Sequence, residues 1–443
     1  MRLFSFVLIC VFAIILSACG RSAKLSVTDG MGPNPLLPSP KESIIPTVHI
    51  ATAVGWPSGV KPQVAEGLTI DLYADNLQHP RWLYALPNGD VLVAESNAPA
   101  NPNKESGFRS WITSKFMAKA GAGVASANRI ILLRDLNKDG VVDEQKVFLQ
   151  DLNSPIGMSL IGDDFYVANT DAVIRYTYSA GETKITDKGT KVLDLPAGSI
   201  NYHWTKNMIA SQDGSKLYIT VGSNSNIGEK GMDNEVGRAA IWELDIASGK
   251  HRVFASGLRN PNGMAWEPLT NSLWVVVNER DQIGSDLVPD YLTSVKDGGF
   301  YGWPYSYFSQ HVDQRVKPQN PELVARAVHP DYALGPHTAS LGLAYSNEVH
   351  LNGLFRNGMF IGQHGSWNRK PFSGYKVIFV PFKEGKPSGL PLDVLTGFLN
   401  DKGQAQGRPV GVLVDHNGGL LVADDVGNKI WRVTQSSEQA SNH

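Results

Sequence analysis

The chain has 443 residues, of which 42% are hydrophobic and 19% charged, with 40 Lys and Arg against 42 Asp and Glu. This composition excludes a disordered or fibrous chain, and a net charge of −2 leaves no basic footprint for nucleic acid. The 44 Gly and 26 Pro residues are typical of short strands and turns, and two cysteines cannot supply a disulfide framework.

The first segment predicts export. Arg2 is followed by an apolar run from Leu3 to Leu16, which is too short to span a bilayer and ends in small residues. The sequence Leu16-Ser17-Ala18-Cys19 resembles a bacterial lipobox, so residues 1–18 are interpreted as a lipoprotein signal peptide and Cys19 as the lipidated residue. An ordinary signal peptide with a chance cysteine is the alternative. The predicted location is the bacterial cell envelope, lipid-anchored at the outer membrane and facing the periplasm.

Residues 19–46 are rich in Gly, Ser and Pro and lack periodicity, which predicts a flexible tether. Residues 47–436 are then the folded domain, and residues 437–443 are a C-terminal tail.

One motif recurs six times in this domain. Each copy has a Pro- or Gly-containing turn, an apolar stretch, a polar turn and a β-rich run, and the copies begin near His79, Ser154, His203, Asn260, Ala339 and Arg408. Turns such as Asn88-Gly89 and Asn417-Gly418 are typical of hairpins. The repeat therefore predicts an all-β fold, a six-bladed propeller of four-stranded antiparallel blades. A pair of β-sandwiches would explain the turns but not the repeat.

Two insertions interrupt the repeat. Residues 97–127 predict a lid-like loop with a short helix over residues 111–119, and residues 283–337 predict a long Gly-, Pro- and aromatic-rich connection.

Asp135, Asn137, Asp139 and Asp143 stand at positions 1, 3, 5 and 9 of a loop with Gly140 at position 6. This spacing is typical of a Ca²⁺ loop, to which the Val141 carbonyl would add a ligand. Position 12 is Lys146 instead of Glu, so a polar hairpin turn is the alternative.

Polar residues open several repeats. His203 opens the third and Arg259-Asn260 the fourth, while Arg369-Lys370 and Arg408 add positive charge in the fifth and sixth. Because repeat starts face the same end of a propeller, these side chains together predict a central pocket for a polyanion. Taken singly, a structural histidine and solvated surface charges are the alternative.

The motif from Gly257 to Ala265 (GLRNPNGMA), followed by that from Lys296 to Pro304 (KDGGFYGWP), resembles the soluble quinoprotein sugar dehydrogenases. The branch is the one described as L-sorbosone dehydrogenase-like or PQQ-dependent aldose dehydrogenase-like, and the resemblance covers about residues 60–434. It implies a propeller with pyrroloquinoline quinone (PQQ) in its mouth, Ca²⁺ beside it, a sugar substrate and a separate electron acceptor.

The resemblance also implies residue roles. His203 matches the general base, Arg259 the arginine beside the reacting quinone oxygen, and Asn260 its polar neighbour. Asp281 and Gln282 match the residues whose carbonyls bind the cofactor Ca²⁺. The carboxylates of PQQ would be held by Thr338, Arg369, Lys370 and Arg408. Tyr202 replaces an acidic residue and Val410 a second arginine of the glucose-oxidising members.

Two other functions remain open. A calcium-dependent lactonase-type hydrolase would use the same fold but needs acidic ligands on the axis, where they are sparse. A non-enzymatic surface binding module would keep the propeller without the chemistry.

Overall fold

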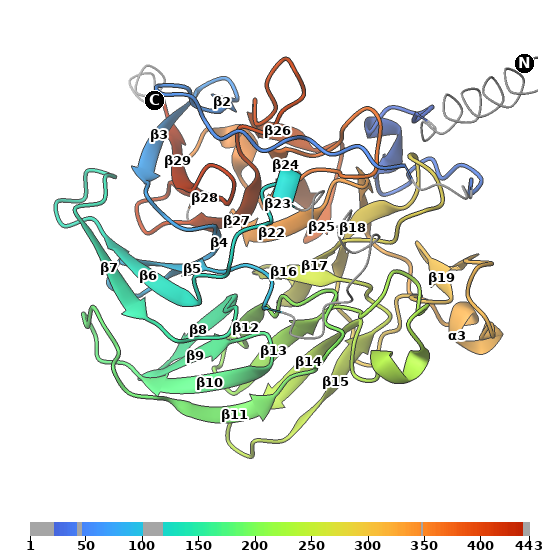
Figure 1. The fold of residues 1–443 in the computed structure, drawn as a ribbon, viewed down its shortest axis with the longest axis horizontal. Helices are drawn as coiled ribbons and strands as arrows, with labels where there is room; N and C mark the ends of the chain where they lie inside the picture. Colours follow the sequence, from blue (N-terminus) through green and yellow to red (C-terminus); the bar gives the residue numbers. More distant parts are fainter. Residues whose placement is uncertain (1–21, 42–46, 101–117, 347–348, 437–443) are drawn as a thin grey trace, which may run out of the picture.

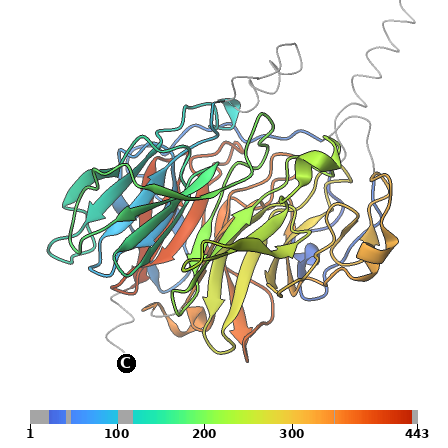
Figure 2. The same ribbon diagram turned by 90° about the horizontal axis from the view of Figure 1, so that it is seen from below.

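The computed structural model describes residues 22–41, 47–100, 118–346 and 349–436. Six antiparallel sheets radiate around a central axis, which confirms the predicted six-bladed propeller (Figure 1). Seen from the side, the sheets stand side by side as the blades of one flat ring (Figure 2). Among the described residues, no helix is long and apolar enough to cross a bilayer.

In each of the first three blades, the four strands are consecutive in the chain. Their strands, each from the axis outward, are β4 (Pro80–Ala85), β5 (Val91–Glu95), β6 (Arg129–Arg134) and β7 (Glu144–Leu149); β8 (Gly157–Ile161), β9 (Asp164–Ala168), β10 (Ala172–Thr177) and β11 (Thr190–Asp194); and β12 (Met208–Ala210), β13 (Lys216–Val221), β14 (Ala240–Asp245) and β15 (His251–Ser256). The 3₁₀ turn η2 (Met232–Glu235) lies between β13 and β14.

Each of the other three blades also includes a strand from the N-terminal part of the chain. Blade four has β16 (Pro261–Glu267), β17 (Ser272–Val277), β18 (Pro289–Ser294) and β21 (Tyr332–Pro336), with β1 (Met31–Gly32) added outside; blade five has β22 (Ser340–Tyr345), β23 (Gly358–Gln363), β24 (Lys376–Lys383) and β26 (Leu392–Thr396), with β25 (Lys386–Pro387) and β2 (Gln63–Val64) added; blade six has β27 (Pro409–Val414), β28 (Leu420–Asp424), β29 (Lys429–Gln435) and β3 (Leu68–Ala74). Because β3 pairs with β29, the two ends of the domain close the ring.

Smaller elements lie outside the blades. They are the 3₁₀ turns η1 (Thr28–Gly30) and η3 (Gly353–Phe355), the hairpin of β19 (Ser306–Tyr307) and β20 (His311–Val312), and the helix α3 (Pro321–Ala325). The predicted insertion of residues 283–337 is therefore shorter than expected, because β18 and β21 within it are blade strands. Most of the helix predicted over residues 111–119 lies outside the described residues.

A glycine in the innermost strand of four blades has a packing role. A Cβ on Gly157 would lie 2.5 Å from the Met208 nitrogen, and one on Gly263 would lie 2.7 Å from the Leu341 carbonyl oxygen. A Cβ on Gly411 would lie 2.7 Å from the Arg81 carbonyl oxygen. Each contact joins the innermost strands of two neighbouring blades, so the repeated glycine allows these strands to approach around the axis.

The core is divided between the blades. The described residues form six buried apolar clusters, and each cluster takes side chains from two adjacent blades. One joins Leu92 and Phe148 of the first blade to Phe165 of the second. Burial between the sheets therefore holds the ring together and fixes the polar residues at the ends of its strands.

Candidate functional site

The candidate site is the mouth of the propeller, which we define as the end at which the innermost strands β4, β8, β12, β16, β22 and β27 begin. The repeat starts bring His203, Arg259, Asn260 and Arg408 to this end, as the sequence predicted. The structure adds a second set of residues there, which lies on blades one, five and six.

His203 precedes β12, and its ring orientation is set by blade three. Nδ1 lies 2.8 Å from the Ser223 carbonyl oxygen and 3.1 Å from Ser223 Oγ. Because a carbonyl only accepts, Nδ1 carries the proton, and Nε2 of the neutral ring keeps its lone pair. Burial and then the charge of Arg259 lower the pKa of His203 well below its usual value. The ring is therefore held neutral, in the tautomer that a base requires.

Arg259 is 1% exposed, and protein groups surround its guanidinium. Nη1 donates to the Glu279 carbonyl oxygen at 2.7 Å, and Nη2 donates to Asn226 Oδ1 at 3.0 Å. Nη2 also lies 3.5 Å from Asp281 Oδ2. Arg259 is thus a fixed charge, with its main hydrogen-bonding directions used by the protein.

Asn260 lies beside His203 at the same end. A Cβ at Gly222 would collide with both Asn260 Oδ1 and the side chain of His203, so a glycine is needed between them. Asn260 Oδ1 is buried and has no hydrogen-bond partner among the described residues. An unsatisfied buried acceptor next to the base indicates a place for a polar ligand atom.

Asp281 and Gln282 differ in their surroundings. The Asp281 carbonyl oxygen accepts from Arg315 Nη1 at 3.0 Å and from Asn226 Nδ2 at 3.2 Å, so two protein donors already occupy it. Gln282 is exposed, with a φ of 74°. The carbonyl geometry implied for Ca²⁺ is therefore absent at Asp281 in the described structure, where the donors would have to leave first.

The carboxylate of Asp281 belongs to a buried network. Oδ1 accepts from Asn368 Nδ2 at 2.6 Å and lies 3.3 Å from His337 Nδ1. Burial acts to raise the pKa of Asp281, but the contact with His337 and the charge of Arg259 outweigh it, so the pKa is lowered. For His337 burial acts to lower the pKa, and Asp281 raises it overall. These contacts join Asp281, His337 and Arg259 into one buried group at the mouth.

Blades one, five and six supply a second set, which we call the Asp425 group: His79, Arg81, His364, Arg408 and Asp425. The Asp425 carboxylate accepts from Arg81 Nη1 at 2.6 Å and His364 Nε2 at 2.9 Å, and it lies 3.6 Å from His79 Nε2. Burial opposes its ionisation, but the two histidines and Arg81 outweigh burial and lower the pKa of Asp425.

His364 has the opposite balance. Burial lowers its pKa to about 4, with Arg408 and Arg81 also lowering it and Asp425 raising it. At neutral pH the Asp425 group thus holds two guanidinium charges against one carboxylate. The buried Nε atoms of Arg81 and Arg408 have no hydrogen-bond partner among the described residues. Unused donors on two buried cations fit the carboxylates of an anionic ligand such as PQQ.

The other predicted carboxylate-binding residues have protein partners. Thr338 is fully buried and its Oγ1 donates to Asp290 at 3.1 Å. Arg369 is 1% exposed and donates to the carbonyl oxygens of Ser285, Leu25 and Pro371 at 2.9 to 3.0 Å. Lys370 is exposed. The structure does not bring these three side chains into the Asp425 group.

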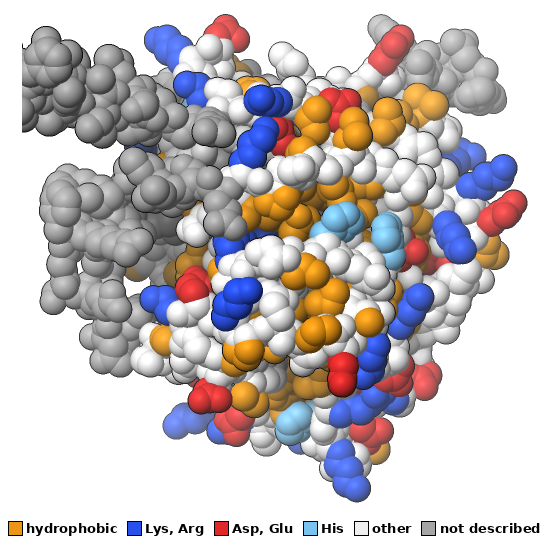
Figure 3. Space-filling model, turned by 90° about the vertical axis from the view of Figure 1, so that its right-hand side faces the viewer, with side chains coloured by type: hydrophobic (Ala, Val, Ile, Leu, Met, Phe, Trp, Pro, Cys, Tyr) orange, Lys and Arg blue, Asp and Glu red, His pale blue; other side chains and the backbone are white. Residues whose placement is uncertain are grey.

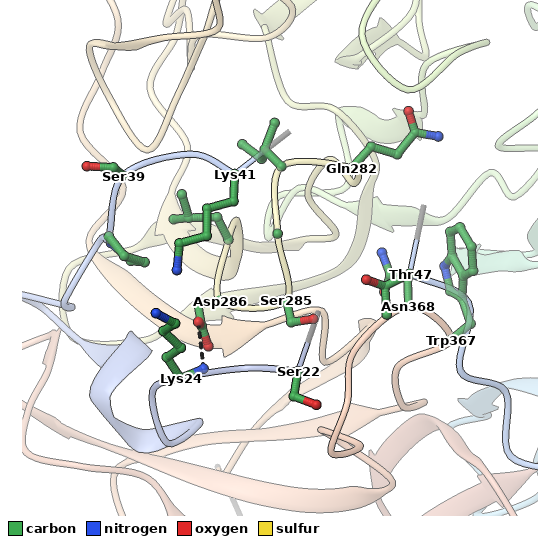
Figure 4. Close-up of a pocket in the computed structure, with 14 residues that line it drawn as sticks. Ser22, Lys24, Ser39, Lys41, Thr47, Gln282, Ser285, Asp286, Trp367 and Asn368 are labelled. Atoms are coloured by element: carbon green, nitrogen blue, oxygen red, sulfur yellow. Dashed lines mark hydrogen bonds between the residues drawn. The ribbon is translucent and has the colours of Figure 1, made fainter. Parts of the chain in front are cut away.

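One of the partners of Arg369, Leu25, belongs to residues 22–41, which we call the N-terminal strap. The strap is not the free tether that its composition predicts, because β1 pairs with β21 and the Lys24 nitrogen donates to Asp286 Oδ2 at 2.9 Å. Figure 4 shows the strap facing residues 282–287 and Asn368 across a cavity of about 50 Å³. This cavity has room for a few water molecules only.

The predicted calcium loop lies between β6 and β7, at the end opposite the mouth. Its oxygens accept backbone hydrogen bonds: Asp135 Oδ2 from Gly140 at 2.8 Å, Asp139 Oδ1 from Val141 at 2.8 Å and Asp143 Oδ2 from Leu136 at 2.7 Å. Asn137 Nδ2 donates to Asp139 at 3.0 Å. Within the part of the chain that is described, no group of three His, Cys, Asp or Glu residues could hold a metal ion.

The charges are mixed on the one face of the surface that Figure 3 shows. Figure 3 shows the edge of the molecule beside β19 and α3, where basic and acidic side chains are interspersed around apolar patches. Single-sign fields that steer a polyanion are not seen on this face, which agrees with the net charge of −2.

Sequence reasoning missed Arg81, Asp425 and Lys206. Arg81 lies two residues after His79, with which the first repeat opens, so its place near a repeat start was a usable signal. Asp425 followed a strand in the sixth repeat without a distinguishing pattern. Lys206 is fully buried, and Nζ donates to the Trp204 carbonyl oxygen at 3.3 Å. Burial and then Arg238 lower its pKa well below the usual value.

The structure is a six-bladed propeller with cations and a neutral histidine at its mouth. The TrAA12-like family model matches residues 120–292 and 306–436, and the chain belongs to that family. This agrees with the resemblance to PQQ sugar dehydrogenases found in the sequence.

Three curated relatives are similar over most of the domain. An uncharacterised protein of Borreliella burgdorferi is 25% identical over 295 residues, which are 64% of this chain and 76% of that protein. The pyrroloquinoline quinone-dependent pyranose dehydrogenase of Coprinopsis cinerea is 26% identical over 68% of this chain, but the match spans only 49% of that enzyme. The aldose sugar dehydrogenase YliI of Escherichia coli is 22% identical over 63% of this chain and 74% of that enzyme.

Two solved structures share the fold. The family AA12 carbohydrate-active enzyme of Trichoderma reesei has a TM-score of 0.69 at 18% identity, covering 88% of this chain and all of that one. The holo PQQ domain of the Coprinopsis cinerea pyranose dehydrogenase has a TM-score of 0.68 at 20% identity, covering 87% and 100%.

Proposed function

We propose that this protein is a PQQ-dependent oxidoreductase that oxidises an aldose or a related sugar aldehyde. The observation that carries the proposal is the pairing of a neutral base, His203, with two guanidinium groups, Arg81 and Arg408, whose buried Nε donors are unused. Relatives with PQQ and sugar dehydrogenase in their names support the cofactor and the reaction class.

The residues divide the work by their position. Arg81 and Arg408 would hold carboxylates of the cofactor, which when bound would accept the C1 hydrogen of the sugar with its two electrons, as a hydride. His203 Nε2 would take the proton of the C1 hydroxyl, and its Nδ1–H bond to Ser223 keeps the ring oriented. Arg259 would supply a fixed positive charge near the developing anion.

Calcium has weaker support from the residues. The Asp281 carbonyl oxygen is held by Arg315 and Asn226, and the Asp281 carboxylate by Asn368 and His337. A Ca²⁺ ion beside PQQ therefore remains a proposal that rests on the resemblance, and no step is assigned to it.

The direct test is to titrate the purified protein with PQQ, with and without Ca²⁺, and to follow cofactor absorbance and dye reduction over an aldose panel. We expect micromolar binding and sugar-dependent dye reduction. PQQ binding without reduction of the dye by any sugar would contradict the enzyme, and absence of PQQ binding would favour a non-enzymatic binding module. Lactone hydrolysis that needs Ca²⁺ but not PQQ would favour the hydrolase.

We also propose that Cys19 is lipidated and anchors the protein to a bacterial membrane, where a separate carrier accepts the electrons. Cys19 lies outside the described residues, so the support is the lipobox resemblance alone. Cys19→Ala should release the protein from the membrane fraction and abolish incorporation of labelled fatty acid. A wild-type protein that incorporates no label would contradict the anchor.

A further inference from the structure

Tyr202, next to the proposed base, has an unusual exposure. Its side chain is 57% exposed, whereas the large aromatic residues Trp274, Tyr291 and Tyr301 are at most 2% exposed. Its hydroxyl has no hydrogen-bond partner among the described residues. An aromatic ring exposed at the mouth of the propeller offers a flat apolar face that a ligand would bury on stacking against it.

The ring is placed against His203. The two ring centroids are 4.7 Å apart, with the planes 83° from parallel. A molecule that lies on the open part of Tyr202, at about 3.5 to 4 Å from the ring, would therefore reach the imidazole with an atom at its edge.

The turn η2 and the residue after it carry two exposed apolar side chains beside the exposed Asp233 and Asn234. Met232 is 42% and Val236 77% exposed, in and just after η2. Glu235 connects this turn to the base, because its Oε2 accepts from the Asn224 nitrogen at 2.7 Å and Asn224 follows Ser223. An exposed aromatic ring next to one base suits a ligand with a C–H face and a hydroxyl-bearing edge.

We propose that Tyr202 is the stacking platform for the sugar ring and sets the preference for a pyranose whose C1 hydroxyl points to His203. The choice of a sugar as the occupant rests on the proposed function. Tyr202 is assigned a binding and orienting role, and His203 keeps the proton transfer. The residue that replaces the acidic neighbour of the base thus has a function of its own.

Its test compares Tyr202→Ala with Tyr202→Phe in the PQQ-loaded protein, using D-glucose, D-galactose and D-xylose with a reducible dye. We expect Tyr202→Ala to raise KM about 5- to 20-fold with kcat changed less than about threefold, because stacking is lost and the base is kept. Tyr202→Phe keeps the ring and should retain the wild-type KM. Leu269→Ala, which removes a 72% exposed side chain from the β16–β17 turn, is the matched control.

A second readout needs no turnover. Methyl β-D-glucopyranoside, which has no free C1 hydroxyl, should show saturation-transfer NMR contacts with the wild type and Tyr202→Phe, and lose them in Tyr202→Ala. Equal KM values in wild type and Tyr202→Ala, or unchanged NMR contacts, would overturn the platform. If the NMR contacts depend on Tyr202 but no sugar reduces the dye, the platform stands and the proposed oxidation fails.

Discussion

The two sides of the mouth use arginine differently. On one side, Arg259 donates hydrogen bonds to Asn226, Asn278 and Glu279. Its Nη2 also lies 3.5 Å from Asp281 Oδ2. On the other side, Arg81 and Arg408 each keep a buried Nε donor unused. A satisfied arginine supplies charge and rigidity, whereas an unsatisfied one is prepared for a ligand. The comparison predicts that cofactor affinity depends mainly on the Asp425 group.

The largest effect is expected at the base. His203→Ala should lower kcat about 10²- to 10⁴-fold while leaving PQQ affinity nearly unchanged, because the base is lost and the cation side is intact. His251→Ala, at an exposed histidine on β15, is the control and should keep full activity. PQQ absorbance titration and dye reduction measure the two quantities. Full activity in His203→Ala would place the base elsewhere, with His337 and His364 as the next candidates.

The next effect concerns the carboxylate between the cations. Asp425→Asn should reduce the free energy of unfolding by about 3–5 kcal/mol, because Arg81 then lacks its buried counter-charge. Thermal and denaturant unfolding measure the change. PQQ should partly restore the stability, since its carboxylates would replace the lost charge. A variant as stable as the wild type would show that Arg81 is compensated by other groups.

The comparison becomes sharpest with single arginine variants. Arg408→Ala and Arg81→Ala should weaken PQQ binding about 10- to 100-fold, because each loses a charge-assisted hydrogen bond in a buried setting. Arg369→Ala should instead lower the melting temperature with little change in PQQ affinity, because its partners are the carbonyl oxygens of the strap and its neighbours. Lys370→Ala, at an exposed position, should change neither. The reverse pattern would restore Arg369 as the carboxylate-binding residue.

Lowering the pH should reveal the contribution of His364 to the stability of the fold. Its pKa is lowered to about 4 in the folded protein, so between pH 6.5 and 4 the unfolded chain binds the proton that the folded chain refuses. Stability should therefore fall as the pH is lowered through this window, by at most about 3 kcal/mol from this group. His364→Gln should remove that part of the slope.

Two carboxyl groups act in the opposite direction. Burial raises the pKa of both Asp290 and Asp424 to about 6, so they gain protons in the folded state as the pH falls. Because they are present in both proteins, the difference between wild type and His364→Gln isolates the histidine. Parallel stability curves for the two proteins would contradict the lowered pKa.

The smallest effect is expected far from the mouth. Asp135→Ala combined with Asp139→Ala removes two acceptors of backbone hydrogen bonds and should cost about 1–3 kcal/mol even without metal. If the loop binds Ca²⁺, the loss of melting temperature should be larger in Ca²⁺ than in chelator. Equal losses in both conditions would identify the loop as a polar hairpin turn.

The strap and the predicted calcium loop show what a local sequence pattern cannot predict. Gly, Ser and Pro in residues 22–41 predict a tether, because composition reports on the chain and not on its partners. The pairing of Met31 with Leu334 and the contact of Lys24 with Asp286 depend on residues about 260 to 300 positions away. The Asp135 loop has the right spacing for Ca²⁺, but its oxygens can equally satisfy backbone donors.

The sequence by itself determined the six-bladed propeller, because hairpin turns and β-rich runs act within each repeat. It also identified His203, Arg259, Asn260 and Arg408 as residues of one mouth, since repeat starts share one end of the ring. Only the tertiary structure decided which arginines keep a hydrogen-bond donor without a protein partner. Arg369 meets Leu25 and Arg81 meets Asp425, both across 344 positions, yet the first contact occupies a guanidinium with carbonyl oxygens and the second leaves Nε unused. Hydrogen-bond partners of buried cations come from distant segments, so their availability for a ligand is a property of the packed ring and not of any local motif.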